Sequence, residues 1–489
     1  MRIELSIPQP VSQVTETLEK AGFSAFLVGG CVRDLLMNRK PKDWDIATDA
    51  TPEKIMGLFP KTVYENTFGT VSVIDETTDI QEFRAIQVTP FRTEGNYSDK
   101  RHPDSVTFGT SLPDDLARRD FTINALAYSP SKGQLTDEFG GCQDLKDKII
   151  RAVGDPTDRL AEDPLRIMRA VRFSAELGFM INSDTEKAFK NKAPDLKQIS
   201  VERIRDEFEK LIKSDNPMQG MELLKNDGLL PYVIRETEVM IGVGQNGAHI
   251  YDVWEHSLRA LQHAADKGFS LEIRLAALLH DIGKPKTKRF SPEKKDYTFY
   301  GHEVVGARIA KKALTDLKFP QKTIDTVEKL VRYHMFFADT DQISLSAVRR
   351  IVAKVGADLV WDLMKVRNCD RIGMGRPKED PYRLRRYEAM IEEAMRAPTS
   401  VAMLKIDGNE LMKLSNEKPG PKLGFILHAL LEEVLEEPDL NTKDYLSKRA
   451  LELFKLTLEE LKFLGEAGKD KQNKVEEEEL SKIRKRHRV

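Results

Sequence analysis

The sequence predicts an α/β domain at the N-terminal end of the chain, followed by a long remainder that is almost entirely helical. Within residues 1–150, short β-rich apolar runs alternate with short helical patterns, whereas from Asp155 onward apolar residues recur at helical spacing. At 489 residues the chain is also too long for one hydrophobic core, so several domains are expected. The expected strands cover residues 25–28, 44–46, 71–74, 86–89 and 125–128.

The helical remainder is clearest in two segments, residues 164–177 and 201–213, where apolar residues lie on one face and basic residues on the others. We expect the chain to divide into four parts. These are an α/β head (1–152), a helical neck and body (153–235), a further helical domain (236–385) and a helical tail (386–489).

Composition excludes several classes of protein. The net charge is only −2, so any contact with nucleic acid must use local basic patches. The three cysteines have no CxxC spacing, which is typical of a reducing compartment. The N-terminus lacks a signal-peptide pattern, and no run approaches the roughly 18 apolar residues of a membrane helix. We therefore expect a cytoplasmic protein without a membrane partner.

The first candidate site lies in residues 26–48. Gly29 and Gly30 directly follow an apolar run, and Asp43 and Asp45 alternate with apolar residues. Because successive side chains of a strand point to opposite faces, both carboxylates are expected on one face, about 7 Å apart. Two such carboxylates beside a glycine turn can hold divalent cations next to a triphosphate.

Two further segments carry groups that suit a nucleotide. The run RRDFTINA at residues 118–125 places guanidinium groups, a carboxylate and an amide close together. Guanidinium forks match phosphate and ribose oxygens. In the run EDPLRIMRAVRF, four side chains recur every three residues and would form one stripe on a helix: Asp163, Arg166, Arg169 and Arg172.

The stripe has a chemical use. Asp163 and Arg166 can offer an acceptor and donors to the edge of a base, and the outer arginines would remain free for the triphosphate. Pro164 suits the first turn of this helix, with Asp163 as its cap. For this helix alone, an ordinary solvated arginine-rich face is the alternative.

This ordered set of motifs resembles the bacterial class II tRNA nucleotidyltransferases (CCA-adding enzymes) of the polymerase-β-like superfamily. The shared motifs are GGxVRD, DxD, RRDFTxNA and EDxxR, and the resemblance covers about the first 235 residues closely. It implies a mixed-sheet head and template-independent addition of C, C and A to the tRNA 3′ end from CTP and ATP. Asp43 and Asp45 would be catalytic and would bind two Mg²⁺ ions. Nucleotide binding would fall to Gly29, Gly30, Arg33, Arg119, Asp120, Asn124, Asp163, Arg166, Arg169 and Arg172.

Two positions depart from the family pattern. Gln87 stands where the family commonly has an acidic residue, so either the metal site is weaker, or Glu82 substitutes, or the position is structural. The segment Phe91–Asp104 resembles a flexible loop associated with the final A addition, which argues against an enzyme that adds only C. Within this loop, Arg101 and His102 replace the usual double arginine before proline.

A second chemistry is expected in the helical remainder, where six side chains recur in an order typical of a metal site: His256, His280, Asp281, His302, His334 and Asp370. The order resembles the HD phosphohydrolases. The resemblance makes His256, His280, Asp281 and Asp370 ligands of one metal, either a transition metal or Mg²⁺, while His302 and His334 would complete a dinuclear site. The domain at 236–385 would therefore bind metal, and in some tRNA nucleotidyltransferases an HD domain removes 2′,3′-cyclic phosphates or 3′-phosphates from tRNA ends. The resemblance also implies that the neck and body (153–235) recognise the nucleotide base and that the tail (386–489) binds tRNA.

Three alternatives stay open at this point. The chain could be an enzyme that adds only A, a bacterial poly(A) polymerase, or a pseudo-polymerase that acts as an HD phosphohydrolase or RNA-binding protein. A poly(A) polymerase would be expected to carry a basic C-terminal extension and no HD cluster, which this chain does not match. The sequence leaves the oligomeric state open.

Overall fold

The computed structural model describes residues 2–65, 69–94, 106–108, 111–245, 250–335, 343–379, 381–395, 401–415, 419–461 and 464. Most of the predicted flexible loop, including Arg101 and His102, lies outside the described residues. The chain forms two compact units, residues 1–235 and 236–489, which are described separately.

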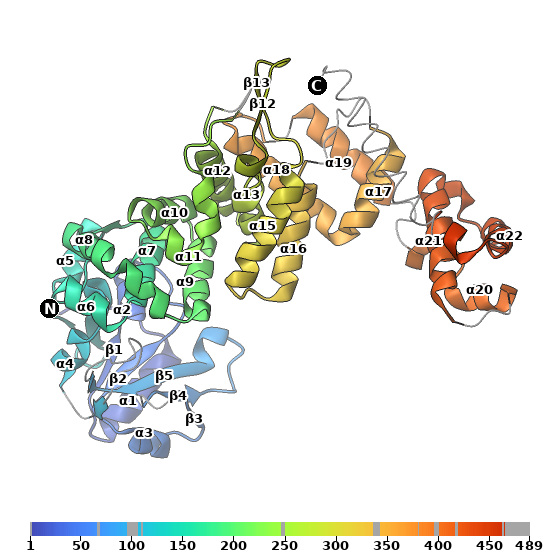
Figure 1. Ribbon diagram of the computed structural model, residues 1–489. Coiled ribbons are helices and arrows are strands. Elements are labelled where there is room, and N and C mark those ends of the chain that lie inside the picture. The colour runs from blue at the N-terminus through green and yellow to red at the C-terminus, as the bar shows by residue number, and fades with distance from the viewer. Residues whose placement is uncertain are drawn as a thin grey trace. The chain divides into compact units, whose positions relative to one another are not determined.

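Unit 1 contains a seven-stranded sheet in the order β3-β4-β5-β2-β1-β8-β9 (Figure 1). Strands β2 and β5 pair in parallel and the other neighbours are antiparallel, which confirms the predicted mixed sheet. Each predicted strand is present within a few residues of its expected position. The strands are β1 (Ala25–Val28), β2 (Asp45–Thr48), β3 (Thr62–Tyr64), β4 (Val71–Ile74), β5 (Ala85–Pro90), β8 (Leu126–Ser129) and β9 (Gln134–Asp137).

The two faces of this sheet differ because side chains alternate along each strand. Leu27 and Ile46 point to a large apolar core that also contains Val11 and Leu18 of the first helix. Asp45 lies two residues from Ala47, whose face carries a smaller apolar cluster. The helices of this α/β part are α1 (Gln9–Lys20), α2 (Gly30–Leu36), α3 (Pro52–Leu58), α4 (Leu112–Ala117), η1 (Gln81–Phe83), η2 (Thr122–Asn124) and α5 (Gly141–Asp147).

The rest of unit 1 is helical, as predicted. Helix α7 (Leu165–Leu177) packs against α9 (Val201–Lys213) through faces with apolar residues at helical spacing. Gly178 adopts a left-handed conformation (φ 70°) and ends α7. The accompanying helices are α6 (Pro156–Glu162), α8 (Ser183–Lys192), η3 (Ala193–Gln198), α10 (Pro217–Asn226) and α11 (Leu230–Val233), and the short strands are β6 (Arg92–Glu94), β7 (Val106–Phe108), β10 (Ile149–Ile150) and β11 (Met180–Ile181).

In its described residues, unit 2 is built from helices and one two-stranded hairpin. Its first bundle packs α12 against α13 and α18, and α15 against α16. The elements are α12 (Val253–Asp266), α13 (Leu271–Leu279), α14 (Lys284–Thr287), β12 (Arg289–Ser291), β13 (Asp296–Thr298), α15 (His302–Asp316), α16 (Gln321–Tyr333), α17 (Leu345–Val355), α18 (Ala357–Gly373) and α19 (Tyr382–Met395).

The last helices form a separate apolar cluster around Leu411, Ile426 and Leu446. They are α20 (Gly408–Ser415), α21 (Pro421–Glu436) and α22 (Lys443–Leu453), with the 3-10 turns η5 (Val401–Met403) and η6 (Pro438–Leu440). Across the described ranges, none of the helices combines the length and apolar character needed to cross a membrane.

Candidate functional site

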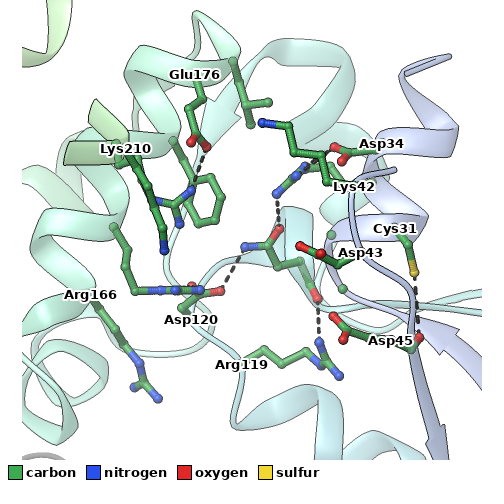
Figure 2. A pocket seen from close by; sticks show the side chains of 18 of the residues that line it. Cys31, Asp34, Lys42, Asp43, Asp45, Arg119, Asp120, Arg166, Glu176 and Lys210 are labelled. Atoms are coloured by element: carbon green, nitrogen blue, oxygen red, sulfur yellow. Dashed lines mark hydrogen bonds and ion pairs between the residues drawn. The ribbon is translucent and has the colours of Figure 1, made fainter. Parts of the chain in front are cut away.

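A cavity of about 1110 Å³ in unit 1 collects the predicted nucleotide-binding residues (Figure 2). Its walls come from the start of α2, the segment before β2, the end of α4 and the facing sides of α7 and α9. All of the residues predicted to be catalytic or to bind the nucleotide line it: Gly29, Gly30, Arg33, Asp43, Asp45, Arg119, Asp120, Asn124, Asp163, Arg166, Arg169 and Arg172. Segments up to about 140 residues apart therefore meet in one place.

The two carboxylates of the DxD pair lie together in the cavity (Figure 2). Strand β2 begins at Asp45, so Asp43 precedes the strand, which corrects the expectation that both alternate along it. Burial raises the pKa of Asp45; Arg119 opposes this rise, and Asp43 and Glu65 add repulsion. A divalent cation would relieve that repulsion, so the donor set fits such an ion.

The glycine turn allows an arginine to approach the backbone. Gly29 has a φ of 73°, and a Cβ at this position would lie 2.7 Å from the Nη1 atom of Arg119. The opposite side of Arg119 is held by Asp115, whose Oδ2 accepts a hydrogen bond at 3.2 Å. A side chain at Gly29 would therefore displace a guanidinium group that faces the cavity.

A chain of hydrogen bonds links the head to α7. Arg33 donates from Nη1 to Asn124 Oδ1 at 2.8 Å, and Asn124 donates from Nδ2 to Asp120 Oδ1 at 3.1 Å. Arg169 donates to the other Asp120 oxygen at 2.6 and 2.8 Å. Burial opposes ionisation of Asp120, but Arg169 and Asn124 lower its pKa to about 2. Asp120 thus acts as a buried anion that orients groups on both sides.

The arginine stripe differs from its prediction in one respect. Asp163 lies just before α7, which begins at Leu165, and its Oδ1 accepts from the Leu165 N–H at 3.1 Å, as expected for a residue at the start of the helix. The outer arginines are not free: Arg169 pairs with Asp120, and Arg172 pairs with Glu207 at 2.5 Å. The prediction of unpaired arginines was therefore wrong.

The base-recognition candidates are also internally paired. Arg203 of α9 donates to Asp163 Oδ2 at 2.7 Å. Arg166 lies 2.5 Å from Glu162 Oε2 and donates to the Arg159 carbonyl at 2.7 Å. Both side chains nevertheless line the cavity, so their polar groups lie where a nucleotide base can reach them.

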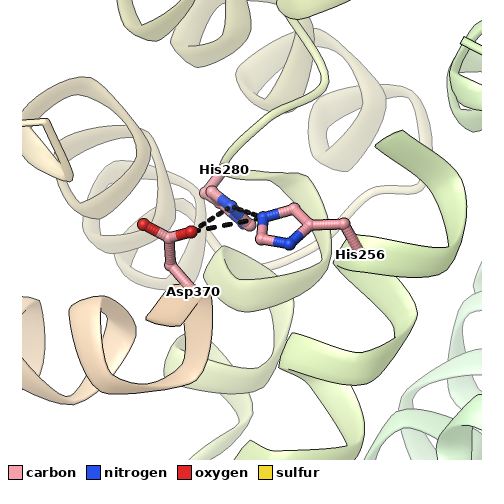
Figure 3. A group of neighbouring side chains, drawn as sticks. All are labelled: His256, His280 and Asp370. Atoms are coloured by element: carbon pink, nitrogen blue, oxygen red, sulfur yellow. Dashed lines mark hydrogen bonds and ion pairs between the residues drawn. The ribbon is translucent and has the colours of Figure 1, made fainter. Parts of the chain in front are cut away.

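A second cluster lies in unit 2 and brings together all six residues of the predicted HD site. His280 and His334 directly follow helices α13 and α16, while His256, His302 and Asp370 belong to α12, α15 and α18. All six side chains are buried. Their donor atoms form two groups, His256 with His280 and Asp370 (Figure 3), and Asp281 with His302 and His334.

Asp281 connects the two groups. Its Oδ2 lies 3.2 Å from Nε2 of both His256 and His280, and its Oδ1 lies 3.2 Å from Nε2 of His302. The Nε2 atoms of His256 and His280 are 2.9 Å apart, and those of His302 and His334 are 3.3 Å apart. A carboxylate with one oxygen toward each histidine pair suits two neighbouring cations.

The outer ring nitrogens support the same interpretation. The Nδ1 atoms of His280, His302 and His334 each lie 2.7 to 2.8 Å from a backbone carbonyl. A carbonyl can only accept, so each Nδ1 carries a proton and Nε2 is left to bind a metal. Although burial opposes it, Asp281 and Asp370 raise the pKa of His280 to about 10, so these two carboxylates stabilise a positive charge at the Nε2 side of this ring, where a metal ion would take the place of a proton. These residues fit divalent metal ions.

Comparisons with known proteins follow the same division. A model described as the poly A polymerase head domain matches residues 25–151, one described as the probable RNA and SrmB-binding site of polymerase A matches 178–241, and the HD domain matches 253–372. A CCA-adding enzyme of Leuconostoc mesenteroides is 34% identical over 439 residues, which cover 89% of this chain and 94% of that protein.

The chain belongs to the CCA-adding enzyme family.

Other members of the CCA-adding enzyme family agree. The Geobacillus thermodenitrificans CCA-adding enzyme is 46% identical over 278 residues, which cover 57% of this chain and 64% of that protein. The crystal structure of the Bacillus stearothermophilus CCA-adding enzyme with CTP aligns at a TM-score of 0.67 and 28% identity, covering 92% of this chain and 98% of that one. The structure of the Thermotoga maritima CCA-adding enzyme with tRNA shares the fold, at a TM-score of 0.51 and 20% identity.

Membership of the CCA-adding enzyme family favours the main interpretation over a poly(A) polymerase or a pseudo-polymerase. The chain is a tRNA nucleotidyltransferase, and its head and HD domains both imply dependence on divalent metals.

Sequence reasoning missed the acidic and basic partners of the stripe. Arg203 and Glu207 lie four residues apart on α9. Arg203 pairs with Asp163, while Glu207 pairs with Arg172 and also lies 4.0 Å from Arg169. Opposite charges at this spacing predict a pair within their own helix, so the sequence carried no signal for partners on α7. Arg39, Lys42 and Lys210 also line the cavity and add positive charge for a triphosphate.

Proposed function

We propose that this chain adds C, C and A to the 3′ end of tRNA, using CTP and ATP without a nucleic-acid template. The cavity supports this proposal most directly, because one space is lined both by the DxD carboxylates and by the Asp163 and Arg166 side chains. The chemistry and the selection of the base would then occur on one bound nucleotide. A cytoplasmic location suits the proposed substrates.

Asp43 and Asp45 would hold Mg²⁺ in this site. When bound, Mg²⁺ lowers the pKa of the RNA 3′-hydroxyl and stabilises the departing pyrophosphate. Arg33 and Arg119, fixed by Asn124 and Asp115, would orient the phosphates. The 3′-hydroxyl would lose its proton to solvent, and its oxygen would form a bond to the α-phosphorus as the bond between that phosphorus and the bridging oxygen of the β-phosphate breaks and pyrophosphate leaves.

Base selection would use the groups at the start of α7. The Asp163 carboxylate can accept from an exocyclic amino group, which cytosine and adenine both carry, and the Arg166 guanidinium can donate to a ring nitrogen. Because both side chains are paired internally, a nucleotide must replace part of that pairing. The amino group common to C and A explains how one pair of side chains can serve both.

We propose in addition that the HD cluster hydrolyses 2′,3′-cyclic phosphates or 3′-phosphates at tRNA ends. The six buried ligands would hold one or two divalent metal ions, Mg²⁺ or a transition metal. Water would form the new bond to phosphorus, one ribose oxygen would leave and take up a proton, and a second hydrolysis would release phosphate. The product carries the free 3′-hydroxyl that nucleotide addition requires.

Primer extension tests the main proposal. Purified protein is incubated with three tRNAs that lack CCA, CA or only A, with CTP and ATP separately and together, and the ends are sequenced. Completion of all three tRNAs to CCA is the expected result. Addition of A alone to the tRNA that ends in CC would show an A-adding enzyme, long A tails a poly(A) polymerase, and no extension a silent head.

A metal assay tests the second proposal. The full chain is loaded with Mn²⁺, freed of excess metal and incubated with tRNA that ends in a 2′,3′-cyclic phosphate. Release of the cyclic phosphate by the wild type, and its loss in an Asp281→Asn variant, are expected. Absence of bound metal and of hydrolysis would overturn this proposal without affecting nucleotide addition.

A further inference from the structure

The β12–β13 hairpin interrupts the HD ligands in the sequence, since it follows Asp281 and precedes His302. Its base is fixed to the metal-binding cluster. The carbonyl of Phe299, directly after β13, lies 2.7 Å from His302 Nδ1, and the Thr287 hydroxyl lies 3.5 Å from the same carbonyl. Figure 1 shows the hairpin projecting beyond the neighbouring helices of its unit. A surface on this hairpin therefore has a defined position beside the cluster.

One face of the hairpin carries exposed aromatic rings. Phe290 and Tyr297 are register partners on adjacent strands, with ring centroids 5.6 Å apart. Their side chains are 59% and 42% exposed, whereas Ser291 and Thr298 on the opposite face are buried. This is the reverse of the usual pattern, in which large apolar side chains are buried and small polar ones exposed.

Lysines border these rings. Residues 288–300 contain four basic residues and two acidic ones, of which Arg289 and Asp296 lie on the opposite face with their register partners Thr298 and Ser291. Lys288 Nζ lies 4.3 Å from the centroid of the Tyr297 ring, and Lys294 Nζ donates to the Tyr300 hydroxyl at 2.9 Å. Tyr300 is 42% exposed. Exposed rings bordered by cations are the combination that binds unpaired RNA, because bases stack on the rings and phosphates meet the cations.

We propose that this surface (Lys288, Phe290, Lys294, Tyr297 and Tyr300), the aromatic hairpin face, binds the unpaired nucleotides at the 3′ end of an RNA substrate. The inference rests on the proposed phosphohydrolase function. It adds to that function a surface that binds the nucleotides preceding the terminal phosphate. The terminal phosphate would reach the buried cluster, and the preceding bases would stack on the hairpin. A mononucleotide has no preceding base and would not use this surface.

Steady-state kinetics of the full-length, Mn²⁺-loaded protein test the proposal. The substrates are a short unpaired RNA that ends in a 2′,3′-cyclic phosphate and a 2′,3′-cyclic mononucleotide. Stacking contributes about 1–3 kcal/mol per base, so the double variant Phe290→Ala/Tyr297→Ala should raise KM for the RNA about tenfold or more. The kcat for the RNA and both constants for the mononucleotide should be unchanged. Tyr382→Ala, which removes a 69% exposed ring from α19, is the matched control.

A second variant guards against damage to the hairpin. Lys288→Glu/Lys294→Glu keeps the aromatic pair and should also raise KM for the RNA alone. If the aromatic variant loses activity on the mononucleotide as well, this charge variant decides the question. Unchanged KM for the RNA in both variants would overturn the proposal and leave the rings a structural role.

RNA crosslinking separates this inference from the phosphohydrolase proposal. An RNA with 4-thiouridine next to its 3′-phosphate is irradiated with the full chain, and the crosslinked peptides are identified. Crosslinks within residues 288–300 that disappear in the aromatic variant are expected, whether or not the phosphate is hydrolysed. Hydrolysis without crosslinks at these residues would overturn the hairpin inference alone, whereas crosslinks without hydrolysis would overturn the phosphohydrolase alone.

Discussion

Asp45 on β2 and Gln87 on β5 are direct register partners in the parallel pair of the central sheet. Gln87 is in turn the antiparallel partner of Ser72 on β4, so the three side chains form a row on one face. Glu82, the alternative source of the acidic group that Gln87 lacks, lies in η1, outside this row. It pairs with Lys40 at 2.9 Å. Gln87 therefore occupies the position beside Asp45, one of the two carboxylates proposed to hold Mg²⁺, without contributing charge.

Replacing Gln87 by glutamate should not lower turnover in CCA addition. The new carboxylate would lie on the face that carries Asp45, where a bound cation would offset its repulsion of Asp45 and could gain a further ligand. The check is kcat for A addition to tRNA that ends in CC, measured over a range of Mg²⁺ concentrations, with Asp45→Asn as the inactive reference. A large loss of kcat in Gln87→Glu would show that the amide has a role of its own.

Removing the guanidinium of Arg203 should impair base selection. Arg203 is a positioning residue, since it donates to Asp163 at 2.7 Å and fixes the direction of that carboxylate. An interaction with a charged group is worth about 1.5–3 kcal/mol, so Arg203→Ala should raise KM for CTP and ATP about tenfold or more and increase misincorporation of UTP.

Arg205→Ala is the matched control, because Arg205 lies on the same helix and pairs with its neighbour Asp206. Partial recovery of selection in Arg203→Lys would support positioning. Equal KM values in Arg203→Ala and Arg205→Ala would contradict it.

The buried anion at Asp120 should make unit 1 less stable in acid. Its pKa of about 2 lies below the unfolded value, so its contribution is present above about pH 4 and is lost as the pH falls toward 2. A shift of this size corresponds to about 2 kcal/mol. Asp120→Asn should therefore lower the free energy of opening, measured by hydrogen exchange of amides in residues 1–235, by about this amount at pH 7.

The difference between wild type and Asp120→Asn should narrow below about pH 4. Asp158→Asn serves as the control, since Asp158 is an exposed carboxylate in α6. A difference that stays constant down to pH 3 would show that Asp120 stabilises the unit by packing alone.

Each of the two ligand groups of the HD cluster should bind one metal ion, so that disrupting one group removes one ion. If Asp281 serves both groups, His302→Ala should reduce the bound Mn²⁺ from about two ions per chain to about one. Chelation with EDTA should abolish phosphate release, while nucleotide addition should recover when Mg²⁺ is supplied. Elemental analysis after gel filtration measures the content.

His263→Ala is the control for this experiment. His263 lies on α12, the helix that carries the predicted ligand His256. It pairs with Glu379 at 3.1 Å and belongs to neither ligand group. A single ion in the wild type would show that only one of the two groups binds metal.

The fold and the membership of the site could be predicted from sequence because they follow from local patterns. Alternation predicted the strands, helical spacing predicted α7 and α9, and the order of the six HD ligands predicted a buried cluster that the structure contains. The pairing within the site could not be predicted. Arg169 finds its partner 49 residues away in Asp120, and only the packing of α7 against the head selects this carboxylate.

The internal pairing of the cavity has a consequence for repeated turnover. The Asp163 and Arg166 side chains already have partners in Arg203 and Glu162. These partners act as placeholders: a base gains only the difference between its own hydrogen bonds and those it displaces, and when it leaves, no buried charge is stranded. Three successive additions require the same site to be emptied and filled again each time. Exchangeable contacts of modest net strength suit that cycle.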